Sequence, residues 1–167
     1  KGFELAFQHN FRDLPQPFDG LGMIANYAYQ DGDRDLKFAT PGYLTTEGFT
    51  PEFPLNFRGL SENSFNLTLY YDKPKYPLSG RLRYTYRDEF LQTEVAEITN
   101  QYPLYTDARG QLNASMTYKI NKIFSVNFSG VNLTKERVIH RAVFSTGPIA
   151  RMRDPDRRFS IGIRGRF

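Results

Sequence analysis

The sequence predicts an all-β protein, specifically a transmembrane antiparallel β-barrel or part of one. Three observations support this fold class. Apolar and polar residues alternate along about seven segments, the segments are about nine to thirteen residues long, and the connections between them alternate between short and long. A period of two places successive side chains on opposite faces of a strand. A tilted strand needs roughly 9–11 residues to cross a bilayer.

The composition excludes several classes of protein. The 167 residues include no Cys, so neither a disulfide framework nor a thiolate metal site is possible. No apolar run approaches the length of a transmembrane helix. The net charge of +4 comes from scattered basic residues, which argues against a nucleic-acid partner. The mean hydropathy of −0.55 is typical of a soluble protein, but barrel strands also lower this average because every second residue faces water.

The first four segments span residues 2–11, 21–30, 63–71 and 78–90. Each has an apolar face and a face rich in Asn, Thr, Gln or Arg. In the fourth, Leu82 and Tyr84 oppose Arg81 and Arg83. A one-residue slip would reverse the two faces.

The last three segments span residues 112–120, 124–133 and 157–167. The alternation changes phase after Gly130, which is compatible with a β-bulge. In the final segment, one parity carries the apolar residues Phe159, Ile161, Ile163 and Phe167, and the other carries Arg158, Arg164 and Arg166.

Connection length predicts the topology. Short connections follow the first, third and fifth segments. Long ones run roughly from Asp31 to Glu62, Leu91 to Gly110 and Thr134 to Asp156. Outer-membrane barrels have short periplasmic turns and long outer loops. We therefore expect Tyr43 and Tyr105 at the opposite end of the sheet from Pro15 and Pro74.

A soluble sandwich or a lipocalin-like barrel is the alternative fold. Strand length and loop alternation favour the membrane barrel, whose apolar face would contact lipid and whose polar face would line a wet lumen. Aromatic residues near strand ends fit interfacial girdles, as at Tyr27, Tyr29, Tyr84 and Tyr86. The residues expected to face the lumen or a plug are Arg81, Arg83, Arg87, Arg158, Arg164 and Arg166.

The inventory of reactive residues does not predict an enzyme. There are two histidines, no spacing typical of metal ligands, and no pairing of a nucleophile with a base. His9 falls on the apolar parity near a strand end. No cofactor or metal is expected.

The long loops are where solute recognition is expected. Their candidate ligand-binding residues are Tyr43, Phe49, Phe53, Tyr102, Tyr105, Arg109, His140 and Arg141. The aromatic side chains suit a neutral glycan and the basic ones an anionic ligand, such as a ferric siderophore or an acidic sugar. The sequence leaves both open.

Several phrases carry a resemblance to a known family, among them KGFELAFQHNF, FRGLSENSFNLTLYYDK, LSGRLRYTYRDEFL, YKINKIFSVNFSGVNLTKE and DPDRRFSIGIRGRF. In order and spacing, the whole chain resembles the last seven strands of a TonB-dependent receptor. The phrases are closest to receptors of the Xanthomonas and Caulobacter type, several of which import oligosaccharides.

The resemblance implies that residues 1–167 are the C-terminal part of a barrel of about twenty-two strands, without its plug domain and earlier strands. It implies the outer membrane of a Gram-negative bacterium and energy-coupled import through a periplasmic TonB complex. Expected partners are lipid, the plug and remaining strands, a small solute and the barrel-assembly machinery, which would read Phe159, Ile161, Ile163 and Phe167. A passive porin-like or structural barrel is the alternative.

Overall fold

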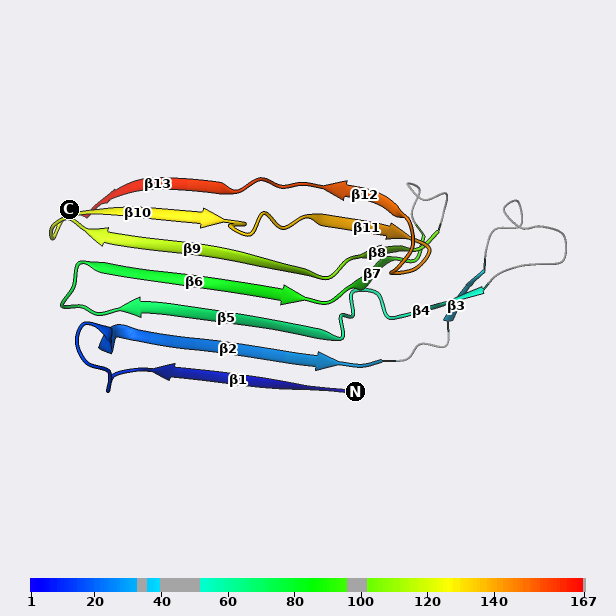
Figure 1. Ribbon diagram of the computed structural model, residues 1–167, viewed down its shortest axis with the longest axis horizontal. Coiled ribbons are helices and arrows are strands. Elements are labelled where there is room, and N and C mark those ends of the chain that lie inside the picture. The colour runs from blue at the N-terminus through cyan, green and yellow to red at the C-terminus, as the bar shows by residue number, and fades with distance from the viewer. Residues whose placement is uncertain (33–35, 40–51, 96–101, 167) are drawn as a thin grey trace.

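The described residues of the computed structural model, namely 1–32, 36–39, 52–95 and 102–166, form mainly antiparallel β-sheet. The largest sheet has seven strands in the order β1-β2-β5-β6-β9-β10-β13 (Figure 1). Its strands are β1 (Gly2–Asn10), β2 (Leu21–Gln30), β5 (Asn63–Asp72), β6 (Leu78–Arg87), β9 (Arg109–Lys119), β10 (Phe124–Val131) and β13 (Arg158–Gly165). The predicted fold class is confirmed, and the strand ends agree with the predicted ones within three residues.

All short connections lie at one end of this sheet and all long ones at the other (Figure 1). The turn after β1 contains a single 3-10 turn, η1 (Phe18–Gly20). An ion pair between Lys73 and Asp19 joins that turn to the one after β5. Tyr105 lies at the end opposite Pro15 and Pro74, as predicted, whereas Tyr43 lies outside the described residues. Among these residues, no helix is long and apolar enough to cross a membrane.

The long connections are more ordered than the sequence predicted. Two of them form a four-stranded sheet, which we call the outer sheet, from β7 (Phe90–Thr93), β8 (Leu104–Thr106), β11 (Val138–Ala142) and β12 (Ile149–Arg153). The third contains a hairpin of β3 (Leu36–Ala39) and β4 (Glu52–Leu55). The outer-sheet order β7-β8-β11-β12 repeats that of β6-β9-β10-β13, so the outer sheet continues the wall of the large sheet (Figure 1).

The change of phase at Gly130 marks the end of a strand. The pairing of β10 with β13 runs without a register shift from Phe124 to Val131, so no bulge lies there. The chain then turns with positive φ at Asn132 (58°) and Lys135 (56°). Positive φ is uncommon outside Gly, and Asn adopts it more readily than most residues.

The outward face of the large sheet is apolar and accessible. On the edge strand β13, Phe159, Ile161 and Ile163 are 73%, 68% and 75% exposed. Exposure of large apolar residues on this scale marks a surface that meets lipid or another chain. In agreement with its predicted parity, His9 lies on this face, where its ring meets Phe11 edge-on at 4.9 Å between centroids.

Aromatic residues gather on the outward face near the end that carries the long connections. Phe65 contacts both Tyr84 and Tyr86, with ring centroids 5.6 and 5.2 Å apart. The Tyr86 hydroxyl reaches a polar network, because it donates to Asp88 Oδ1 at 2.7 Å, and Asn63 Nδ2 donates to Asp88 Oδ2 at 2.6 Å. Rings in an apolar layer with hydroxyls in a wet one are typical of an aromatic girdle at a membrane interface.

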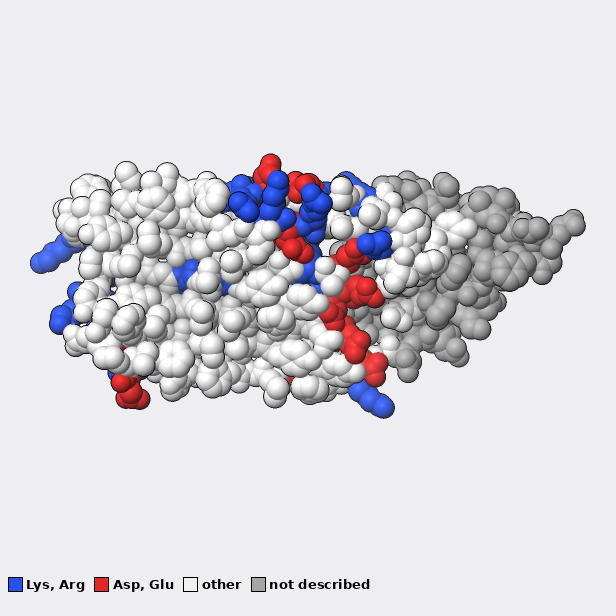
Figure 2. Space-filling view, viewed as in Figure 1, with Lys and Arg blue, Asp and Glu red and all other residues white. Residues whose placement is uncertain are grey.

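A belt of charge crosses the wall where the large sheet gives way to the outer sheet. The strands are interrupted at this level by residues 88–89, 107–108, 132–137 and 154–157. Figure 2 shows Lys, Arg, Asp and Glu side chains gathered there, while the surface over the large sheet is almost free of charge on the face in view. An uncharged band next to a charged belt is the surface expected of a strand wall that enters a bilayer.

The large sheet is open among the residues that the structure describes, where strands β1 and β13 each have one neighbouring strand. The buried apolar cluster, Leu55, Leu91 and Tyr105, belongs to the outer region and not to the large sheet. This follows from the architecture, because a single wall with lipid on one side and a wet interior on the other has no dry centre of its own.

Candidate functional site

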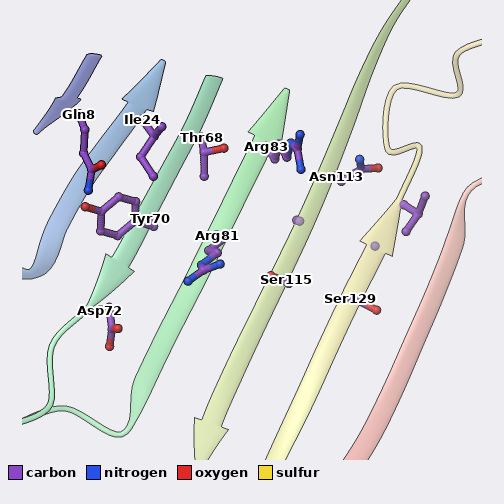
Figure 3. A pocket seen from close by; sticks show the side chains of 13 residues that line it. Gln8, Ile24, Thr68, Tyr70, Asp72, Arg81, Arg83, Asn113, Ser115 and Ser129 are labelled. Atoms are coloured by element: carbon purple, nitrogen blue, oxygen red, sulfur yellow. The ribbon is translucent and has the colours of Figure 1, made fainter. Parts of the chain in front are cut away.

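The polar face of the large sheet carries a groove of about 680 Å³ (Figure 3). It crosses β1, β2, β5, β6, β9 and β10, and its polar lining consists of Gln8, Thr68, Tyr70, Asp72, Arg81, Arg83, Asn113, Ser115 and Ser129. Because these side chains come from alternate positions of each strand, the groove lies on the face opposite the aromatic girdle. Arg81 and Arg83 therefore lie on the polar face, as the alternation predicted.

Tyr70 shapes one end of this groove. Its hydroxyl donates to Asn10 Oδ1 across β2, and its ring lies over Gly22. The register pairs Gly22 with both Tyr70 and Asn10. A Cβ at position 22 would overlap the ring, so Gly22 is required for this close approach.

The two arginines of the groove have only weak partners in the described part of the chain. Arg83 Nη2 lies 3.4 Å from Asn66 Oδ1, and neither Arg81 nor Arg83 joins an ion pair there. Their charges are therefore available to a group that enters the groove.

A second basic groove of about 430 Å³ lies at the end that carries the short turns. Its cationic lining is Lys119, Lys122, Arg164 and Arg166. Ser125 pairs with Lys119 on one side and with Arg164 on the other, so three adjacent strands supply this surface.

The outer sheet contains deeply buried residues. Leu91 is 1% exposed and Tyr105 is 8% exposed, and Leu55 from the end of β4 packs with them. Burial raises the pKa of the Tyr105 hydroxyl, and the nearby Glu89 carboxylate raises it further. Tyr105 therefore stays neutral and helps to hold the outer sheet together.

His140 occupies a buried polar position in the same sheet. It is 6% exposed, and its Nδ1 lies 3.1 Å from Thr106 Oγ1, which donates to Gln92 Oε1 at 3.0 Å. Burial lowers the pKa of His140, and the positive charges of Arg153 and Arg151 lower it further. The neutral ring can then accept the hydrogen bond of a donor or donate one of its own.

Arg141 fastens β11 to its neighbours. Its Nε donates to both carboxylate oxygens of Asp107, at 2.8 and 3.0 Å, and its Nη1 donates to the Gly147 carbonyl at 3.0 Å. The ion pair is partly buried, where charge-assisted bonds are stronger than at an open surface.

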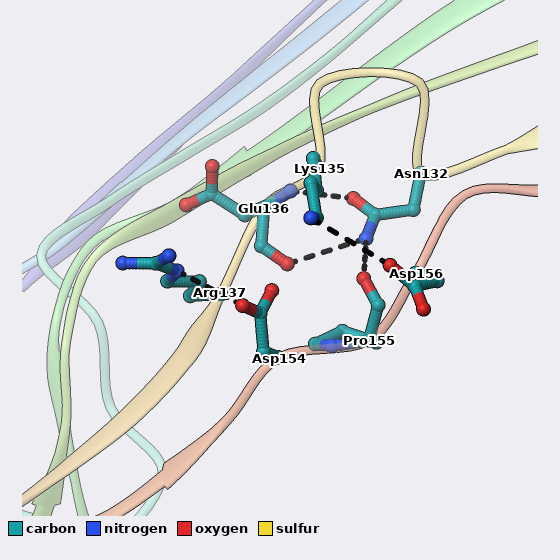
Figure 4. A network of polar contacts seen from close by, with 7 residues as sticks. All are labelled: Asn132, Lys135, Glu136, Arg137, Asp154, Pro155 and Asp156. Atoms are coloured by element: carbon teal, nitrogen blue, oxygen red, sulfur yellow. Dashed lines mark hydrogen bonds and ion pairs between the residues drawn. The ribbon is translucent and has the colours of Figure 1, made fainter.

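Asn132 joins the wall to the segment that leads into β13 (Figure 4). It is 5% exposed, and its amide donates to the Pro155 carbonyl at 2.8 Å, while its Oδ1 accepts from the Glu136 amide at 2.8 Å. Its backbone amide donates to Asn113 Oδ1 at 3.0 Å. Two exposed ion pairs, Lys135–Asp156 and Arg137–Asp154, flank it. The sequence analysis missed this position, although the change of phase beside it was visible.

The predicted site residues fall into three groups. Tyr105, His140 and Arg141 come together in the outer sheet as buried or partly buried residues, while Arg109 is exposed at the start of β9. Arg81 and Arg83 line one groove and Arg164 and Arg166 the other; Arg158 lies on β13 and Arg87 at the end of β6. Tyr102 is half-buried, and Tyr43, Phe49, Phe167 and the side chain of Phe53 lie outside the described residues.

A comparison with protein families identifies the family to which this sheet belongs. Residues 1–133 match the family of the TonB-dependent receptor-like β-barrel. The chain belongs to the TonB-dependent receptor family. Its open sheet is part of the barrel domain of such a receptor. No curated protein and no solved structure matches the chain.

Membership in this family indicates the general function of the chain. TonB-dependent receptors are transporters and not enzymes, and their barrel domain implies the outer membrane of a Gram-negative bacterium. It also implies a plug domain, a TonB partner and a solute. Among the described residues, no group of three or more His, Asp or Glu side chains could hold a metal ion.

Proposed function

We propose that this chain is the C-terminal part of the barrel of an active outer-membrane transporter. The transporter binds a scarce solute, an oligosaccharide or a ferric siderophore, at its outer loops. It imports that solute through movement of a plug, driven by a periplasmic TonB complex. Further strands pair with the free edges of β1 and β13, because unpaired backbone groups in lipid cost several kcal/mol each.

One observation carries this proposal beyond a simple pore. The two grooves of the polar face hold Arg81, Arg83, Arg164 and Arg166, and none of these joins an ion pair among the described residues. A wall with several unpaired cations suits an interior that is filled by a second body, such as an acidic plug surface. This supports a gated transporter over a passive pore.

The outer sheet supports recognition at the outer end. Its buried cluster and the Arg141–Asp107 ion pair give the loops a fixed shape, and fixed loops lose little conformational entropy when they bind a ligand. Tyr105 and His140 would support the binding surface from beneath. Direct contact with a solute through Arg109, Tyr102 and the residues of the first loop stays a prediction.

Uptake measured with and without energy coupling tests the proposal. Cells that depend on the full-length receptor should lose uptake of the solute when TonB is deleted, while the receptor stays at the surface and still binds. A passive porin-like barrel would instead let small solutes through without TonB and would show a steady open conductance in a planar bilayer.

A further inference from the structure

Four arginines lie together at the outer end of the wall, and we call them the arginine rim: Arg87, Arg109, Arg151 and Arg153. Arg87 ends β6 and Arg109 begins β9, and the register places them directly opposite each other. Like charges in directly opposed positions destabilise a sheet. The pair is therefore costly unless an anion offsets the repulsion.

The other two arginines lie on the same face of the wall. In the outer sheet, Arg151 pairs with His140, His140 pairs with Thr106, and Thr106 pairs with Phe90. The Arg87 guanidinium lies over the Phe90 ring, 4.1 Å from its centroid. Since directly opposed residues point to the same side, this row links Arg87 to Arg151 across the outer sheet.

The electrostatics of His140 agree with this placement. The pKa of His140 is lowered by burial first and then by the charges of Arg153, Arg151 and Arg109. Three members of the rim therefore lie near one imidazole ring. Only Asp107 acts in the opposite direction, and its carboxylate is already bound by Arg141.

The rim lacks carboxylate partners within the described residues. Arg87 bonds only to neutral oxygens, Ser61 Oγ at 2.6 Å and the Gly59 carbonyl. No ion pair in this part of the chain includes any rim residue, although Arg137 and Arg141 nearby each have an aspartate. Arg109, Arg151 and Arg153 are also exposed, so a ligand arriving from outside can reach them.

The positive face continues below the rim. Arg81 and Arg83 occur at alternate positions on β6, on the parity of Arg87, and they line the groove of about 680 Å³. Among the described residues, Asp72 is the only carboxylate that lines that groove. An anion bound at the rim would therefore meet further cations along the wall once movement of the plug exposes them.

We propose that the arginine rim binds anionic groups of the transported solute, so that the solute carries several carboxylate or comparable oxyanion groups. Guanidinium groups bind such oxyanions in a bidentate manner, and a concave surface of one charge raises the local concentration of ligands of the opposite charge. This inference rests on the proposed function and deepens it. It selects the anionic alternative that the sequence left open against a neutral glycan.

Isothermal titration of the full-length receptor in detergent tests the inference with three probes. Trigalacturonate represents an acidic oligosaccharide, ferric citrate an anionic iron chelate, and maltotriose an uncharged sugar of similar size. We expect one of the anionic probes to bind, with affinity that falls as salt rises, and maltotriose not to bind. The anionic probe that binds identifies the source of the oxyanion groups.

Two variants show whether the rim is responsible. Arg109→Gln and Arg151→Gln should each lower the affinity of the receptor for the anionic probe about tenfold. Arg109→Gln should keep or raise the thermal midpoint of the receptor, because it removes the repulsion between directly opposed arginines, and Arg151→Gln, which is opposite the neutral His140, should leave the midpoint unchanged. Arg137→Gln is the matched control, since Arg137 is paired with Asp154 outside the rim, and it should leave affinity unchanged.

Three results would overturn the inference: binding of maltotriose that the rim variants do not change, binding of neither anionic probe, or equal anion affinity in wild type and both rim variants. Each of these can occur while uptake of a solute still depends on TonB. Failure of the inference is thus separable from failure of the proposed function.

Discussion

Leu82→Arg tests the assignment of the two faces of the wall. Leu82 is the fifth residue of β6, on the apolar parity, and is paired with Leu69 on β5 and Ala114 on β9. It is 41% exposed, so its side chain meets the medium around the sheet and not a packed protein core. If that medium is hydrocarbon, an arginine there loses its hydration.

The expected cost is roughly 2–4 kcal/mol near the midplane of the bilayer. The charge cannot reach the interior, because successive residues of a strand point to opposite faces. The cost should appear in the free energy of unfolding of the full-length receptor in phospholipid vesicles, measured by urea titration.

Ile24→Arg is the matched control. Ile24 lies on the opposite parity of β2, lines the groove of about 680 Å³, and pairs with Thr68. An arginine there would enter a polar, wet space, so the expected loss is below about 1 kcal/mol. The reverse order, with Ile24→Arg costly and Leu82→Arg neutral, would refute the assignment of faces.

Four further outcomes are expected. Asn132→Ala should lower stability by about 1–3 kcal/mol, because it leaves the Pro155 carbonyl and the Glu136 amide without their partner. Asn132→Asp should also lower stability, because a carboxylate still accepts from the Glu136 amide but cannot donate to the Pro155 carbonyl, and unchanged stability in both variants would contradict this account. His140 has a folded pKa below its unfolded value of about 6.5, so the unfolded state binds more protons at low pH. The stability of the receptor should therefore fall as pH drops below that value. His140→Gln should remove this pH dependence, and a dependence that persists in the variant would exclude His140 as its source. In intact cells, a membrane-impermeant thiol reagent should modify Ala108→Cys and not Lys75→Cys, and equal labelling would refute the topology. Deletion of Phe167 should cut the amount of assembled receptor far more than transport per assembled molecule, which surface immunodetection and uptake would show; normal assembly with lost uptake would instead assign the residue to the solute pathway.

The seven strands of the large sheet could be predicted because each has one lipid-facing and one polar face. That environment forces a strict period of two, as in β13, where Phe159, Ile161 and Ile163 alternate with polar residues and glycine. The end of β10 was harder to predict from the sequence. Gly130 was interpreted as a possible bulge, but the decisive residue is Asn132, whose positive φ and side-chain bonds end the strand.

The outer sheet could not be predicted because its strands are three to five residues long and are irregular. Register shifts at His140/Arg141 and between Leu91 and Thr93 break the alternation that reveals a strand. Both faces of β8 are buried, so Leu104, Tyr105 and Thr106 show no contrast between apolar and polar positions. The sequence placed Tyr105 and His140 in recognition loops, whereas their burial makes them part of the framework.

The repeated strand order changes how the outer end of this receptor should be understood. Because β7, β8, β11 and β12 continue β6, β9, β10 and β13 in the same order, this part of the outer end is an extension of the barrel wall. An extended wall keeps the division of faces that the membrane imposes below it. The polar face therefore runs on past the charged belt, and Arg87 and Arg151 lie on one surface although they belong to different sheets. A solute bound at that rim would already lie over the groove that contains Arg81 and Arg83, so binding and entry would use a single continuous face.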